Sequence, residues 1–147
     1  MRVALDSNVL IYAELEPESR KGQRAKAVIL RAMADAVIPA QVLGEFVRFV
    51  QRRAPYSLEA ALGQVTLYRT LCLAPPTTDA LIVRAAATSR DHGLQLWDAI
   101  ICHAAAEAGA KALLTEDLQD GRVIAGLKIL NPFEDANDAA IDAMLDG

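Results

Sequence analysis

The sequence predicts a single α/β domain, with a short parallel sheet flanked by helices on both faces. Short, continuous apolar runs alternate with longer segments whose apolar residues recur at helical spacing, a pattern typical of parallel strands buried between helices. Alanine is the commonest residue and aromatic residues make up only 5%, which favours helices over an all-β fold. A length of 147 residues suits one domain with its own core.

The predicted strands are apolar runs of three or four residues that polar residues or prolines end. Five such runs occur, at residues 2–5, 36–39, 72–74, 112–115 and 127–130. Runs without polar alternation indicate strands that are covered on both faces. Because no repeat or linker interrupts the pattern, we expect residues 1–133 to form the domain and residues 134–147 to add an acidic C-terminal helix or tail.

The predicted helices lie between these runs. Helical spacing of apolar residues, with capping and breaking residues, places them at residues 9–13, 22–34, 41–53, 58–70, 78–91 and 98–108. The polar segments 14–21 and 116–126 are predicted as loops. Residues 54–57 are predicted as a break in which Ser57 caps the next helix.

Composition excludes several classes of protein. An apolar content of 53% is too high for a disordered chain. Two distant cysteines and two histidines do not provide a disulfide scaffold or a Cys/His zinc site. No segment reaches the roughly 20 apolar residues that span a bilayer, and Asp6 and Asn8 interrupt the apolar run that a signal peptide would need. We therefore expect a soluble, cytoplasmic protein with no membrane partner.

Basic residues concentrate in one part of an acidic chain. The net charge is −4, yet residues 20–53 hold eight Lys or Arg residues against only Asp35 and Glu45. Such a stretch forms either the solvated faces of two helices or a surface that contacts phosphates. The second interpretation makes Lys21, Arg24, Arg48, Arg52 and Arg53 the candidate nucleic-acid-binding residues.

Four acidic residues lie inside or against apolar segments, where an unpaired carboxylate is costly. Asp6 and Asp117 follow predicted strands, Asp98 begins a predicted helix, and Glu45 lies in the second turn of a helix. These positions border the crevice in which open parallel sheets bind ligands. Arg48 is the nearest local cation that could pair with any of the four.

The gathered carboxylates predict a metal site. A divalent cation removes the repulsion between them, and all-oxygen ligation suits Mg²⁺ or Mn²⁺. Such ions polarise a phosphate and activate a water, which is what phosphodiester hydrolysis needs. The residues expected to orient the carboxylates or a bound water are Ser7, Asn8, Thr115 and Glu116, with capping and turn roles as the alternative.

The ordered set of acidic segments is similar to that of PIN-domain nucleases, and within them to VapC-type toxins of bacterial type II toxin–antitoxin pairs. The resemblance rests on VALDSNVLIY, QVLGEF, LWDAIICHAAAEAGA, LLTEDLQDG and ILNPF, which together reach from Arg2 to Phe133. It implies that Asp6, Glu45 and Asp98 are the three central acids of the family's metal site. Asp117 matches the more variable fourth acid, and Glu116 and Asp120 in the same loop remain alternatives.

The resemblance also implies an Mg²⁺- or Mn²⁺-dependent endoribonuclease with an RNA substrate and a cognate antitoxin that inhibits it. A catalytically silent RNA- or partner-binding domain of the same fold is the alternative. A flavodoxin-like receiver is disfavoured, because a single acid, Asp6, follows the first strand. We expect Trp97 in the core, with the border of an RNA channel as the alternative.

Excess apolar residues between residues 22 and 53 predict an interaction surface. They are Val28, Ile29, Leu30, Met33, Phe46, Val47, Phe49 and Val50. From this surface, and from the resemblance, we expect a homodimer and a docking site for an apolar antitoxin helix. Burial of both helices on two sides is the alternative.

Overall fold

The computed structural model describes residues 1–53 and 58–146. Its sheet has the strand order β1-β2-β4-β3, with the bounds Val3–Leu5, Ala112–Leu114, Leu127–Leu130 and Val123–Ile124. β1 pairs with β2 and β2 with β4 in parallel, with Val3 opposite Ala112 and Ala112 opposite Lys128. β1 and β2 are fully buried, as their unbroken apolar sequences predict.

The sheet is mixed rather than wholly parallel, which corrects the prediction. β3 lies within the predicted loop 116–126 and pairs antiparallel with β4. Ala125 and Gly126 join the two strands with positive φ angles of 51° and 81°, the conformation of a tight hairpin turn. A two-residue strand is too short to show a hydrophobic period, so the sequence did not reveal it.

Two predicted strands, residues 36–39 and 72–74, are reduced to isolated parallel bridges. Val37 bridges Ala4 on one side and Leu73 on the other, so both segments only extend the edge of the sheet beside β1. Pro39 ends the first segment and helix α3 follows at once. Pro75 and the following proline end the second, since proline has no N–H for a ladder.

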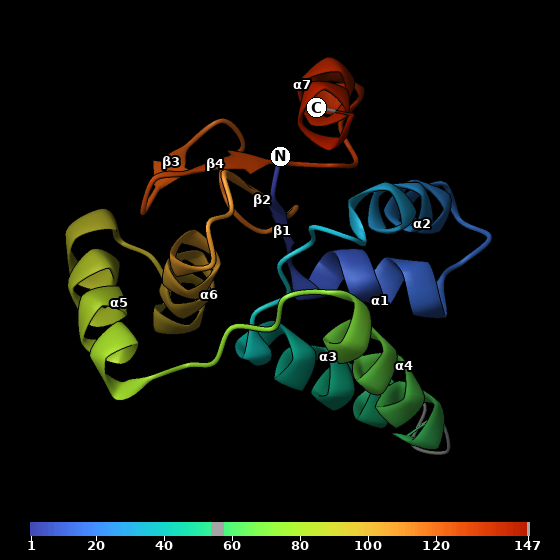
Figure 1. Cartoon of the computed structure of the whole chain (residues 1–147), viewed down its shortest axis with the longest axis horizontal. Helices are drawn as coiled ribbons and strands as arrows, with labels where there is room; N and C mark the ends of the chain where they lie inside the picture. The colour runs from blue at the N-terminus through green and yellow to red at the C-terminus, as the bar shows by residue number, and fades with distance from the viewer. Residues whose placement is uncertain (54–57, 147) are drawn as a thin grey trace.

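Seven α-helices occur in the described ranges. They are α1 (Ser7–Leu15), α2 (Arg20–Ala32), α3 (Ala40–Arg53), α4 (Leu58–Leu71), α5 (Asp79–His92), α6 (Leu96–Glu107) and α7 (Asp138–Leu145). Figure 1 shows α1 to α4 gathered on one side of the sheet and α5 and α6 on the other. Each predicted helix exists, with ends displaced by a few residues, and the predicted break at 54–57 lies outside the described residues.

The turn between α1 and α2 depends on a close backbone approach. Ser19 Oγ accepts a hydrogen bond from the N–H of Gly22 at 2.9 Å and so caps α2. A Cβ atom on Gly22 would lie only 1.8 Å from the carbonyl oxygen of Glu16. Only glycine therefore lets α2 pack this closely against the end of α1.

The core has two parts. The larger one surrounds β1 and β2 and includes the fully buried side chains of Phe46, Leu5 and Ile38. The smaller one joins α5 to α6 through residues such as Leu81 and Ile100. Because α6 contributes to both, the helix that carries Asp98 is held from two sides.

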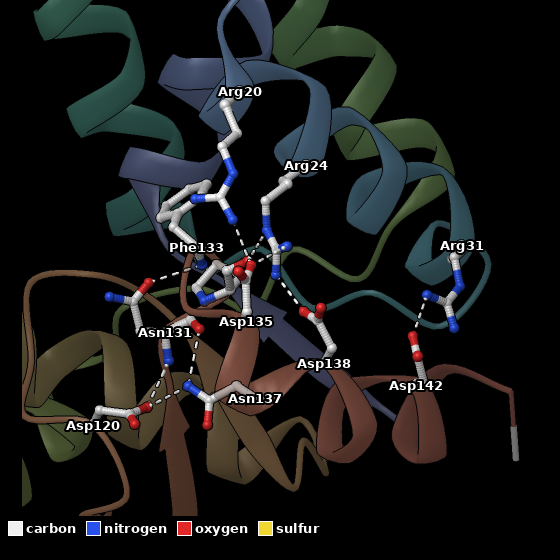
Figure 2. Close-up of polar contacts among 11 residues, drawn as sticks. Arg20, Arg24, Arg31, Asp120, Asn131, Phe133, Asp135, Asn137, Asp138 and Asp142 are labelled. Atoms are coloured by element: carbon white, nitrogen blue, oxygen red, sulfur yellow. Dashed lines mark hydrogen bonds and ion pairs between the residues drawn. The ribbon is translucent and has the colours of Figure 1, made fainter.

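The acidic C-terminal segment is held by the basic face of α2 (Figure 2). A 3₁₀ turn, Asp135–Asn137, precedes α7. Arg24 forms ion pairs with Asp135 and Asp138, and Arg31 contacts Asp142 at 2.7 Å. Three of the eight basic residues between 20 and 53, namely Arg20, Arg24 and Arg31, therefore form ion pairs with the acidic tail. None of the helices in the described ranges is long and apolar enough to cross a membrane.

Candidate active site

The parallel pairing of β1 and β2 brings two acidic segments to one edge of the sheet. Asp6 follows β1 directly, and its N–H donates to the carbonyl of Leu114, the last residue of β2. Thr115 and Asp117 come next along that second segment. The carboxyl ends of the two parallel strands thus place Asp6 and Asp117 beside one another, as the sequence predicts.

Asp6 is the most buried of the acids, with 4% of its surface exposed. It caps α1, accepting from the N–H of Ser7 at 2.7 Å. Its other oxygen accepts from Thr115 Oγ1 at 2.7 Å and from Asn8 Nδ2 at 3.4 Å. These bonds fix the orientation of the carboxylate without neutralising its charge.

Asn8 and Thr115 connect Asp6 to Asp117. Asn8 Nδ2 donates to Asp117 Oδ2 at 3.1 Å and to Thr115 Oγ1 at 3.0 Å. The N–H of Asp117 donates to the same threonine oxygen at 3.1 Å. Because the Asn8 amide nitrogen faces carboxylate oxygens of both Asp6 and Asp117, which can only accept, the amide must place its nitrogen on this side.

Glu45 comes from α3 and is tied to α1. Ser7 Oγ donates to Glu45 Oε2 at 3.0 Å, and Gln41 Nε2 donates to Glu45 Oε1 at 3.1 Å. Gln41 was not among the predicted site residues, although it lies one helical turn before Glu45, a spacing that the sequence shows. In the described parts of the chain Glu45 forms no ion pair with Arg48, the partner that the sequence suggested.

Asp98 lies in the first turn of α6 and is half-buried. Its pKa is raised, first by burial and then by the charges of Glu45 and Asp117. Burial raises the pKa of Asp6 to about 6, against the hydrogen bonds from Thr115 and Ser7, and Glu45 and Asp117 raise it further. These mutual effects show that the four acids form one cluster, here called the acid cluster.

No cation from the described residues forms an ion pair with the acid cluster. The side-chain oxygen of Asn8 is also buried without a hydrogen-bond partner there, which is costly unless a water or ion fills the space. Both features, and the all-oxygen donors, fit Mg²⁺ or Mn²⁺. Within the same ranges no three Asp, Glu, His or Cys side chains lie close enough together to hold a metal ion as they stand, so the acids would have to move closer to bind one.

The two alternative fourth acids have other partners. Glu116 forms an ion pair with Lys21 and accepts from Tyr12 Oη at 2.7 Å. Asp120 accepts from the N–H of Asn131 at 2.8 Å, in the network that holds the C-terminal segment (Figure 2). Asp117 alone of the three is bonded to Asn8, so the geometry favours it as the fourth acid.

The candidate RNA-binding residues divide into two groups. Arg48 and Arg52 border a hollow that also touches Glu45, and Arg53 borders a second hollow that touches Asp117. Lys21 and Arg24 have protein partners instead: Lys21 pairs with Glu116, and Arg24 holds the C-terminal segment. Each would have to leave an ion pair to contact a phosphate.

Two further expectations are wrong. Trp97 is not in the core, since 55% of its surface is exposed at the start of α6, next to Asp98. The broad apolar surface on α2 and α3 does not exist either, because α1, α4 and the sheet cover these helices. Four of its eight predicted members are buried, namely Val28, Ile29, Phe46 and Val50, and Leu30 is the strongly exposed one.

Comparison with known proteins agrees with this fold. The family model described as PIN domain matches residues 3–126. Over 121 residues the chain is 35% identical to ribonuclease VapC7 of Mycobacterium tuberculosis, a match that covers 78% of this chain and 81% of that protein.

Solved structures show the same fold at lower identity. One is Mycobacterium tuberculosis VapC20, described as a sarcin-ricin loop cleaving toxin, with a TM-score of 0.66, 17% identity and coverage of 78% of this chain and 91% of that one. A toxin–antitoxin complex from Klebsiella pneumoniae gives a TM-score of 0.67, 20% identity and coverage of 90% and 98%. With its family model, its ribonuclease relative and its fold in agreement, this chain belongs to the PIN domain family.

Proposed function

We propose that this chain is a metal-dependent endoribonuclease and the toxin of a bacterial toxin–antitoxin pair. The acid cluster carries the proposal: the charges of Glu45 and Asp117 raise the pKa of both Asp6 and Asp98, and no cation of the described residues forms an ion pair with these acids. Such an arrangement weakens the fold unless a ligand compensates for it, and perturbed carboxylates in a cleft are typical of functional sites. The similarity to ribonuclease VapC7 supports RNA as the substrate.

Asp6, Glu45, Asp98 and Asp117 would hold Mg²⁺ or Mn²⁺. When bound, such an ion polarises a phosphate oxygen and lowers the pKa of a coordinated water. The chain's own part is to orient the carboxylates. Ser7 holds Glu45 through its hydroxyl, and the hydrogen bonds of Asn8 and Thr115 keep the oxygens of Asp6 and Asp117 in place.

Arg48, Arg52 and Arg53 would hold the RNA backbone. They follow Glu45 on the same helix and border hollows that begin at the acid cluster. Contacts of this kind position a strand without reading its sequence. They also compensate for the repulsion between phosphates and the acids.

A cognate antitoxin would bind the groove between α2 and α4. This groove has a volume of about 220 Å³ and is lined mainly by apolar side chains, among them Ile29, Leu30, Met33 and Leu67. An apolar antitoxin helix placed there could send a basic side chain to the acid cluster. The homodimer stays a prediction that rests on the resemblance to VapC-type toxins, since α2 and α3 do not form the broad apolar surface.

Incubation of the purified chain with end-labelled structured RNA tests the proposal. Cleavage should need Mg²⁺ or Mn²⁺, stop in EDTA, and fall by orders of magnitude in Asp6→Asn and Asp98→Asn. Glu134→Gln, which removes an exposed carboxyl outside the cluster, is the matched control. RNA binding without cleavage at any metal concentration would instead favour the catalytically silent domain.

A further inference from the structure

Phe49 occupies an unusual position for an aromatic residue. It lies on α3 one helical turn after Glu45, and its side chain is only partly buried. Within residues 1–53 and 58–146 it is not among the side chains that pack against either core cluster. The fold therefore gives no packing reason for a phenyl ring at this position.

Phe49 lines both of the hollows that touch the acid cluster. The first, of about 210 Å³, is lined by Glu45 and by Arg48 and Arg52. The second, of about 370 Å³, contains Asp117 and Arg53. Ser7, Ile11 and Phe49 line both hollows, and Phe49 is the one aromatic side chain among these three.

Arg53 covers this ring. Its guanidinium carbon lies 5.1 Å from the centroid of the Phe49 ring, within the range of a cation–π contact. Aromatic rings and guanidinium planes are the two protein surfaces on which unpaired nucleobases stack. A base could enter between them when the exposed Arg53 side chain moves away.

We propose that Phe49 and Arg53 form a nucleobase subsite beside the acid cluster. The inference rests on the proposed ribonuclease function and deepens it. A base next to the phosphate held at the acids stacks on Phe49, and Arg53 closes over it. Such a base must be unpaired and unstacked, so this subsite selects a strand that is open at the cleavage point.

Two oligonucleotides with the same phosphates separate stacking from charge. One is a 12-nucleotide oligoadenylate, and the other has the same length but carries abasic residues throughout. Both carry a fluorescent label, and binding to the full chain is measured by anisotropy in EDTA, which prevents metal-dependent cleavage. The wild-type chain should bind oligoadenylate about tenfold more tightly than the abasic strand, as stacking of one base on an aromatic ring predicts.

Substitutions at Phe49 and at Arg52 should have different effects on binding. Phe49→Leu should remove the preference for oligoadenylate and keep the salt dependence, while Phe49→Trp should retain the preference. Arg52→Gln should weaken binding of both strands equally and flatten the salt dependence, since it removes only a phosphate contact. Urea unfolding of each variant confirms that the fold is intact.

A folded Phe49→Leu variant that still prefers oligoadenylate over the abasic strand would overturn the subsite. This holds even if the substitution weakens binding of a protein partner. If the chain binds neither strand, the subsite is also wrong. Cleavage of structured RNA then distinguishes the two levels of the argument: continued metal-dependent cleavage leaves the proposed function standing, and absent cleavage contradicts both.

Discussion

Neutralising Asp6 should change the pH dependence of stability, because the acid cluster strains the fold. In the folded chain the pKa of Asp6 is about 6, against 3.8 as the ordinary value. Below pH 3.8 the group is protonated in both folded and unfolded chains. Between these values the folded chain keeps a proton that the unfolded chain has lost, so the free energy of unfolding falls as the pH rises.

The expected magnitude follows from the difference between the two pKa values. A pKa that rises from 3.8 to about 6 lowers the free energy of unfolding by about 3 kcal/mol in total at high pH. About 2 kcal/mol of this loss develops between pH 4.5 and 7. Asp6→Asn removes this charge but turns an amide toward the donors of Thr115 and Asn8, which costs about 1–3 kcal/mol at every pH. The variant should therefore gain stability relative to wild type as the pH rises.

Urea unfolding in EDTA, at several pH values from 4.5 to 7, measures this difference. The free energy of unfolding of Asp6→Asn, relative to that of the wild type, should increase by about 2 kcal/mol across the range. The same difference for Glu134→Gln should not change with pH. Added Mg²⁺ should stabilise the wild type at pH 7, since a ligand of the folded state raises its stability. A difference for Asp6→Asn that does not change with pH would refute the argument that burial strains this carboxylate.

Four other outcomes are expected. Mn²⁺ should quench the fluorescence of Trp97, the single tryptophan, and the quenching should be lost in Asp98→Asn; equal quenching in that variant would place the metal elsewhere. Asp117→Asn should reduce RNA cleavage less than Asp98→Asn, and kinetics showing the reverse order would contradict the ranking of the acids. Charge reversal at Arg52 and Arg53 should weaken RNA binding and flatten its salt dependence while calorimetry shows unchanged Mn²⁺ affinity. Antitoxin affinity should respond to both Mg²⁺ and Asp98→Asn, and indifference to both would remove the proposed mechanism of inhibition.

The positions of Asp6 and Asp117 were predictable, because both acids follow the carboxyl ends of buried strands. Asp6 follows β1 and Asp117 follows β2, and parallel pairing brings such ends together. Asp98 at the start of a helix was recognisable from the apolar segment that follows it. The pairing of Ser7 with Glu45 was not predictable, since it depends on how α1 and α3 cross.

Tertiary charge pairing was the main feature that the local sequence concealed. Arg24 belongs to a basic stretch by sequence, but its partners Asp135 and Asp138 lie more than a hundred residues away (Figure 2). The prediction that Phe46 belongs to an exposed surface was wrong for a related reason, since its side chain is buried. Helical spacing shows which residues share a face, but it does not show that α4 and the sheet cover two faces of α3.

The most direct test of the central claim is the rate of RNA cleavage against Mg²⁺ concentration, for the wild-type chain and for Asp98→Asn. If the acid cluster holds the catalytic metal, the wild-type rate should rise to saturation with Mg²⁺ and vanish in EDTA. Asp98→Asn should lose orders of magnitude in rate at every Mg²⁺ concentration while it unfolds in urea as a normal folded domain. An Asp98→Asn variant that cleaves RNA as fast as the wild type at the same Mg²⁺ concentrations would contradict the assignment of this site.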